Sequence, residues 1–149
     1  MIERIEAELL EAMKSGDTSK RETLRMLKSS LKNAEIEKGT ELGDEEVISV
    51  IQKEVKRRKE AFQSYQDAGR PEQAKLEEEE ATILGAYLPE QMSESDLRAL
   101  ISEYLAKNPV APNEIGKAMG ALSAELKGKA DMGLVSRLVR ELVTGTGTA

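Results

Sequence analysis

Apolar residues recur every three or four positions along most of the chain, which is the period of an amphipathic helix. The pattern predicts seven helices and no strand, so the expected fold class is all-α. The expected helices cover about 2–15, 19–38, 44–68, 71–88, 94–107, 113–126 and a last stretch that follows Asp131.

Several helix ends carry recognisable signals. Ser19 and Glu22 have the spacing of a capping box, which predicts the start of the second helix. Gly39 has the position of a glycine that ends a helix. Asp44 and Asp131 each precede a new apolar stripe, so we expect them to cap the third and seventh helices.

The third and fourth predicted helices can be aligned as an antiparallel hairpin centred on Gly69. This register pairs Phe62 with Leu76, Val55 with Ile83, and Ile51 with Tyr87. Each apolar stripe has one charged interruption, Arg58 and Glu80, at the same distance from the turn. We therefore predict a partly buried Arg58–Glu80 ion pair, within about 4 Å, that fixes the register of the hairpin.

A proline in the segment Leu88–Met92 marks a domain boundary, because Pro89 stops the fourth helix and favours an extended residue before it. We expect an N-terminal domain that contains the antiparallel hairpin, and a small C-terminal domain of three helices. The expected division is 1–88, a linker at 89–93, a C-terminal domain at 94–143 and a disordered tail at 144–149.

The composition excludes several kinds of site. The 149 residues contain no histidine and no cysteine, which removes the commonest general base and the usual zinc ligands. We expect no catalytic residue, no metal and no cofactor. No apolar run is long enough to span a membrane, and we expect a cytoplasmic protein. The net charge is -6, so binding to nucleic acid would require a local basic patch.

The most unusual local pattern is a strip of small residues on the sixth predicted helix. Glycine inside a helix costs about 1 kcal/mol relative to alanine, yet Gly116 and Gly120 both lie there. Together with Ala124 and Gly128 they have four-residue spacing beside the apolar stripe. A surface without side chains lets another backbone approach closely. That backbone is either another helix of the same domain, a protein partner, or the phosphate chain of an RNA.

Lysines near this strip favour the RNA alternative. Lys117 flanks the glycines, while Lys127 and Lys129 enclose Gly128 in the following turn. The start of the seventh helix adds N–H groups that can bind an anion, although the Asp131 carboxylate competes for them.

Two other charged clusters are interpreted as solvated helix faces. The first is basic and contains Lys53, Lys56, Arg57 and Lys59, with nearby acids that dilute it. The second is the acidic run Glu77–Glu80, whose side chains point around the helix axis and do not converge on a metal.

Five segments together make the chain resemble the stand-alone GatB/YqeY family. They are 24–31 (LRMLKSSL), 54–60 (EVKRRKE), 87–93 (YLPEQMS), 115–120 (IGKAMG) and 127–131 (KGKAD). The C-terminal part resembles the tail domain of the B subunit of the glutamine-dependent tRNA amidotransferase.

This resemblance implies a two-part helical fold whose C-terminal part helps hold tRNA. It makes candidate nucleic-acid contacts of Gly116, Lys117, Gly120, Lys127, Gly128 and Lys129. The carbon–nitrogen ligase chemistry of the amidotransferase lies in parts that this chain lacks, so we expect no autonomous activity. The first hypothesis is therefore a non-catalytic tRNA-associated module. The alternatives are a protein-interaction adaptor and an accessory of glutamine-dependent amide transfer to tRNA.

Overall fold

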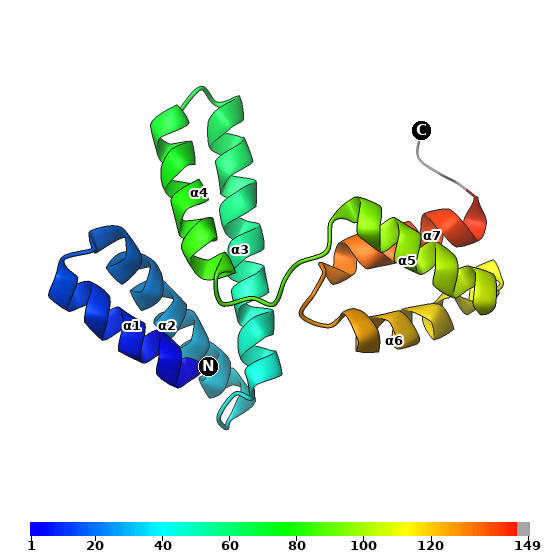
Figure 1. The fold of residues 1–149 in the computed structure, drawn as a ribbon, viewed down its shortest axis with the longest axis horizontal. Coiled ribbons are helices and arrows are strands. Elements are labelled where there is room, and N and C mark those ends of the chain that lie inside the picture. The colour runs from blue at the N-terminus through cyan, green and yellow to red at the C-terminus, as the bar shows by residue number, and fades with distance from the viewer. Residues whose placement is uncertain (146–149) are drawn as a thin grey trace. The chain divides into compact units, whose positions relative to one another are not determined.

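A computed structural model describes residues 1–145, and these residues fall into two compact units. The first unit runs from Met1 to Leu88, and the second begins at Pro89. The described residues form seven α-helices, one short 3₁₀ helix and no strand (Figure 1). The all-α fold class predicted from the apolar periodicity is confirmed.

The first unit consists of two helical hairpins, α1 with α2 and α3 with α4 (Figure 1). The helices are α1 Ile2–Ser15, α2 Thr18–Lys38, α3 Asp44–Asp67 and α4 Pro71–Gly85. One apolar face of each helix contributes to a shared core, as the 3.6-residue period requires. The buried members of this core are Ile5, Leu9, Leu24, Leu27, Leu31, Val47, Ile51, Val55, Leu84 and Tyr87.

Two of the predicted helix caps in this unit are wrong. Asp17, and not Ser19, caps α2, because the Asp17 carboxylate accepts a hydrogen bond of 3.1 Å from an N–H of the first turn. Asp44 lies inside α3, and the cap position falls on Gly43, whose N–H donates to the Glu46 carboxylate at 3.1 Å. In both cases another carboxylate satisfies a backbone N–H at the helix start. The cap therefore lies two residues earlier than predicted in α2 and one residue earlier in α3.

The α3–α4 hairpin has the predicted register at its charged positions. Arg58 Nε lies 2.8 Å from Glu80 Oε2. Leu76 was predicted to face the seam and does not, since 57% of it is exposed. Ala74 and Ala81 are buried on this helix instead, and Leu76 lies about 200° around the axis from Ala74. The other predicted pairs contribute to the core, which contains Ile51, Val55 and Tyr87 with Ile83 against it.

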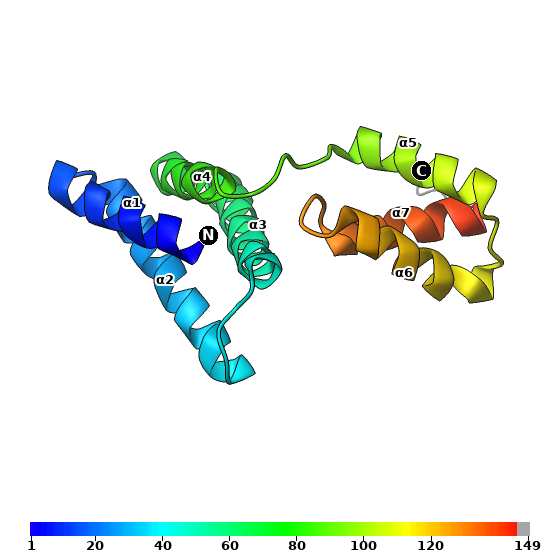
Figure 2. The same cartoon turned by 60° about the horizontal axis from the view of Figure 1, so that its bottom comes forward.

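The second unit contains α5 Glu94–Lys107, the 3₁₀ helix η1 Pro112–Glu114, α6 Ile115–Leu126 and α7 Met132–Thr144 (Figure 2). The helix predicted from residue 113 thus begins as a 3₁₀ turn, which its proline starts. Asp131 caps α7 as predicted, through a 3.3 Å hydrogen bond from an N–H of the first turn. The buried core of this unit comprises Leu97, Ile101, Ala118, Leu122, Leu126, Ala130, Val135, Leu138 and Val139.

Part of the expected linker is attached to the second unit. The Gln91 side-chain amide donates to the Gly128 carbonyl at 2.7 Å, and the Met92 N–H donates to the Lys129 carbonyl at 3.0 Å. The Ser93 hydroxyl then caps α5. The segment predicted as a linker therefore closes the turn between α6 and α7.

Three helices end at a glycine in the left-handed conformation, and Gly16 ends α1 with φ of 76°. Gly39 ends α2 with φ of 86°, as predicted, and Gly145 ends α7 with φ of 67°. The tail predicted to be disordered from residue 144 is helical at Thr144, and 146–149 lie outside the described residues.

Candidate functional site

The small-residue strip of α6 is open to solvent. Gly116, Gly120 and Ala124 are all exposed. A Cβ atom built on Gly116 or on Gly120 has no heavy atom within 4 Å beyond its own neighbourhood. Tight packing of another helix of the domain against these glycines is therefore wrong as an explanation of the pattern. We call the exposed residues Gly116, Gly120 and Ala124 the α6 strip.

Lysines lie at both ends of the α6 strip. Lys117 is in the first turn of α6, whereas Lys127 and Lys129 follow its last residue, and all three are exposed. The two ends are about 15 Å apart along the helix. The Lys117 ammonium lies 2.8 Å from the carboxylate of Glu114. An exposed pair of this kind contributes about 0–1 kcal/mol, so the lysine can exchange it for another anion.

Gly128 has a different role from the other glycines. It is buried and has φ of 81°, a conformation that side chains with a Cβ rarely adopt. Its carbonyl accepts the hydrogen bond from Gln91. Gly128 is therefore part of the turn between α6 and α7 and does not belong to the exposed α6 strip. The Asp131 carboxylate accepts from the Gly133 N–H at the start of α7, so this N–H is already satisfied, and the carboxylate opposes an anion there.

The Arg58–Glu80 pair belongs to a larger buried cluster in the first unit. Arg58 is 8% exposed, and its guanidinium also lies 3.4 Å from Glu54 and 3.8 Å from Glu77. Ser30 of α2 donates to Glu54 at 3.2 Å. The sequence predicted Glu80 beside Arg58, but it did not predict Glu54 or Glu77. The cluster links three helices and is consistent with the fixation of the hairpin register.

The electrostatics of this cluster are unbalanced toward negative charge. Burial raises the pKa of Glu80; Arg58 opposes this increase, and the neighbouring Glu77 reinforces it. Glu77 and Glu80 are partly buried, so the expectation that the whole acidic run forms a solvated face is wrong for these two residues. Among the described residues, no group of three or more aspartates and glutamates is arranged to hold a metal ion.

The basic cluster on α3 is solvated, as predicted from the sequence. Lys53, Lys56, Arg57 and Lys59 are exposed. Arg57 also lies 3.4 Å from the buried Glu54 carboxylate.

A second polar contact that the sequence did not predict joins α1 to the end of α4. The buried Tyr87 hydroxyl donates to the Glu8 carboxylate. The Arg4 guanidinium lies 4.7 Å from the centre of the Tyr87 ring and 3.6 Å from Glu8. Burial and the hydrogen bond to Glu8 raise the pKa of Tyr87, so the phenol stays protonated and remains a donor at neutral pH.

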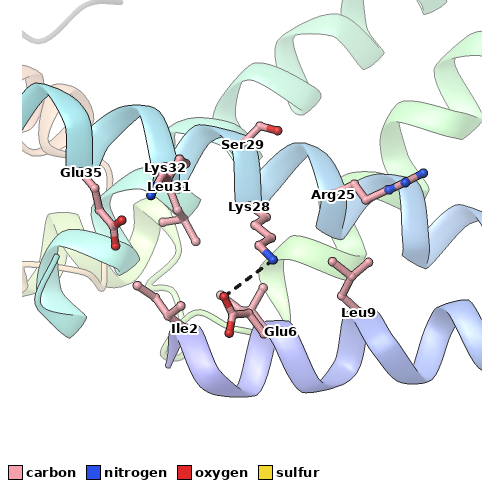
Figure 3. Close-up of a pocket in the computed structure, with 10 residues that line it drawn as sticks. Ile2, Glu6, Leu9, Arg25, Lys28, Ser29, Leu31, Lys32 and Glu35 are labelled. Atoms are coloured by element: carbon pink, nitrogen blue, oxygen red, sulfur yellow. Dashed lines mark ion pairs between the residues drawn. The ribbon is translucent and has the colours of Figure 1, made fainter. Parts of the chain in front are cut away.

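A groove with a volume of about 570 Å³ lies between α1 and α2 (Figure 3). Its floor is apolar, and Lys28 reaches across it from α2 to Glu6 on α1 at 3.8 Å. The groove was not predicted from the sequence. The sequence does contain one signal for it, which is the row of cations spaced three and four residues apart on α2. The lining residues are Ile2, Ile5, Glu6, Leu9, Arg25, Lys28, Ser29, Leu31, Lys32 and Glu35.

In the described part of the chain, every helix is too short or too polar to cross a bilayer. This agrees with the absence of a membrane-spanning run in the sequence.

Comparison with known proteins gives one family and several distant relatives. The family model described as Yqey-like protein matches residues 2–143. The chain is 25% identical to "Altered inheritance of mitochondria protein 41, mitochondrial" of Pyrenophora tritici-repentis over 96% of this chain and 81% of that protein. It is 23% identical to the protein of the same name from Clavispora lusitaniae, over 85% and 74% of the two chains. An uncharacterized protein of Schizosaccharomyces pombe is 32% identical over 60% of this chain and 72% of its own length.

Proposed function

The chain belongs to the Yqey-like protein family, and from this premise we propose that it is a non-catalytic module that holds structured RNA, tRNA in particular. The proposed contact surface is the α6 strip with Lys117, Lys127 and Lys129. The observation that carries the proposal is that Gly116 and Gly120 face open space.

The open glycines support a contact with a partner's backbone. Each glycine destabilises a helix interior by about 1 kcal/mol relative to alanine. Nothing in the described part of the chain occupies the space that their missing side chains leave. A sugar–phosphate backbone can approach such a surface closely, because no side chain holds it away. The short distance strengthens the contacts between the nucleic acid and the protein surface.

The lysines supply the electrostatic part of the contact. They lie at both ends of α6 and are exposed, so they reach different phosphates of one strand. RNA helices are recognised largely through shape and through their phosphates and 2′-hydroxyls, which suits a surface of glycines and lysines. The resemblance of this part of the chain to the tail domain of the amidotransferase B subunit supports tRNA as the RNA. The net charge of -6 opposes binding at long range, so we expect modest affinity that falls with salt.

A titration of tRNA into the full chain at low salt tests this proposal. The variant Lys127→Glu/Lys129→Glu is compared with the wild type and with Lys53→Glu/Lys59→Glu, which changes the net charge equally on exposed positions of α3. We expect the α6-surface variant to bind at least about tenfold more weakly. The slope of log K against log salt should fall by about two, because two phosphate contacts are lost.

Three outcomes contradict the proposal. The wild type fails to bind tRNA at low salt, both variants bind as well as the wild type, or the α3 variant alone loses binding. The last result would assign the contact to the basic cluster on α3. Circular dichroism of each variant shows whether its helices are intact. Because the module is proposed to be non-catalytic, the purified chain should not convert misacylated tRNA in the presence of glutamine and ATP.

A further inference from the structure

We propose that the groove between α1 and α2 binds an amphipathic helix of a partner protein, and that the partner helix carries acidic residues beside its apolar stripe. The proposal concerns the first unit and does not depend on RNA binding by the second. Its basis is an apolar track of helical length with cations along one wall.

The apolar track extends beyond the groove at both ends. Ile2 and Leu9 of α1 face α2 across the groove (Figure 3). One turn beyond Leu9 on α1 lies Met13, which is 48% exposed. One turn beyond Lys32 on the groove face of α2 lies Ile36, which is 69% exposed. Because the two helices run antiparallel, these residues extend the track in opposite directions.

The length of the track matches a short docked helix. Ile2 and Met13 are eleven positions apart on α1, and Arg25 and Ile36 are eleven positions apart on α2. This corresponds to about 16 Å, or three helical turns. An amphipathic helix that docks in a groove between two helices presents apolar residues at three- and four-residue spacing over such a length.

The charges on the groove select the chemistry of the occupant. Arg25, Lys28 and Lys32 project from the α2 wall. Arg25 lies 3.6 Å from Glu22, and Lys28 lies 3.8 Å from Glu6. Both pairs are exposed, and such pairs contribute little.

Lys32 has no ion pair within residues 1–145. Carboxylates on a docked helix can therefore pair with this wall without loss of a strong internal contact.

The same residues disfavour a nucleic acid as the occupant. A phosphate backbone gains nothing from the apolar surface that Ile2 offers in the groove and that Met13 and Ile36 offer beyond it. A protein helix uses both the apolar floor and the basic wall, so the groove fits it better.

Two designed peptides test the proposal with the full chain. Both are amphipathic helices of about three turns with the same leucine stripe; one has glutamates on both flanks and the other has lysines. At physiological salt the Debye length is about 8 Å, so local charges dominate. We expect the glutamate peptide to bind at least about tenfold more tightly. The net charge of -6 favours the lysine peptide, so it cannot produce this preference.

Variants of the chain locate the binding. Lys28→Glu/Lys32→Glu should abolish or reverse the preference for the glutamate peptide, whereas Lys53→Glu/Lys59→Glu, with the same change of net charge, should keep it. Ile36→Ser should weaken binding several-fold without affecting the fold, since Ile36 is mostly exposed. Fluorescence anisotropy measures the affinities. Methyl NMR signals of Ile2, Leu9 and Leu31 should shift on addition of the glutamate peptide.

Several results would overturn the proposal. They are no binding of the glutamate peptide at millimolar concentration, equal binding of the two peptides, equal loss in both charge variants, and shifts confined to residues outside the groove. Binding of a short RNA that depends on Lys28 and Lys32, without binding of the glutamate peptide, would assign the groove to nucleic acid.

Discussion

Replacement of Gly116 and Gly120 by alanine tests whether the α6 strip is open. Both residues lie within α6, and neither has a positive φ. An added Cβ meets no heavy atom within 4 Å at either position. Alanine should therefore improve the helix without a clash, and each single substitution should stabilise the second unit.

The magnitude follows from the position of each glycine in the helix. Gly120 lies in the middle of α6, where alanine is favoured over glycine by about 0.8–1.0 kcal/mol. Gly116 is in the first turn, whose N–H groups lack intrahelical partners, so its gain should be smaller. The double variant should gain about 1–1.5 kcal/mol. In a unit of this size, 1 kcal/mol raises Tm by about 4–8 °C.

Hydrogen exchange measured by mass spectrometry suits this prediction, because it follows the second unit separately from the first. Exchange of the core amides of α6 and α7 should slow in Gly120→Ala and in the double variant. Gly128→Ala is the matched control. Gly128 has φ of 81°, and a side chain with a Cβ destabilises this conformation by about 1–2 kcal/mol. The same substitution of glycine by alanine should therefore accelerate exchange of the core amides of the second unit.

Destabilisation by Gly120→Ala would refute the reasoning, because it would show that something packs on the strip. The double variant also separates stability from function. If RNA approaches the glycines closely, affinity for tRNA should fall while the fold becomes more stable. A stabilised variant with unchanged tRNA binding would remove the glycines from the proposed contact.

Three further predictions concern the first unit. Arg58→Met leaves buried carboxylates without their cation and should destabilise the unit by about 3–5 kcal/mol in urea denaturation; a loss below about 1 kcal/mol would show that the cluster is solvated. Burial raises the pKa of Glu80 above its usual 4.5, so the folded state binds more protons than the unfolded state, and the Glu80 contribution to stability should decline as pH rises from about 4.5 through the raised pKa. Glu80→Gln should remove that decline, and identical pH profiles for variant and wild type would contradict it. Tyr87→Phe loses a hydrogen bond to a carboxylate and should cost about 1.5–3 kcal/mol by the same denaturation assay, whereas Tyr65→Phe, at a position with no such bond among the described residues, should have little effect.

The helices and the hairpin register could be predicted because they depend on local information. The 3.6-residue period indicated the elements, and the equal distances of Arg58 and Glu80 from Gly69 aligned two of them. Leu76 was misplaced because an apolar residue need not face the core when alanines on the other side of the helix allow closer packing.

The candidate sites depended on information that one helix does not contain. The sequence placed Gly116 and Gly120 on one face, but whether that face meets another helix depends on the packing of the whole unit. Glu77 approaches Arg58 only after α3 and α4 pack against each other. Glu54 lies one turn before Arg58 on α3, so the sequence did contain that contact as a four-residue spacing. The groove requires the pairing of α1 with α2, since neither helix alone predicts its floor.

The hydrogen bonds from Gln91 and Met92 to the turn between α6 and α7 determine where the second unit can be cut for use in another protein. A graft that began at the first residue of α5 would lose both donors and leave the Gly128 and Lys129 carbonyls without them. A graft that began at Pro89 would keep both hydrogen-bond donors. The sequence boundary of a transplantable module therefore lies several residues before its first helix.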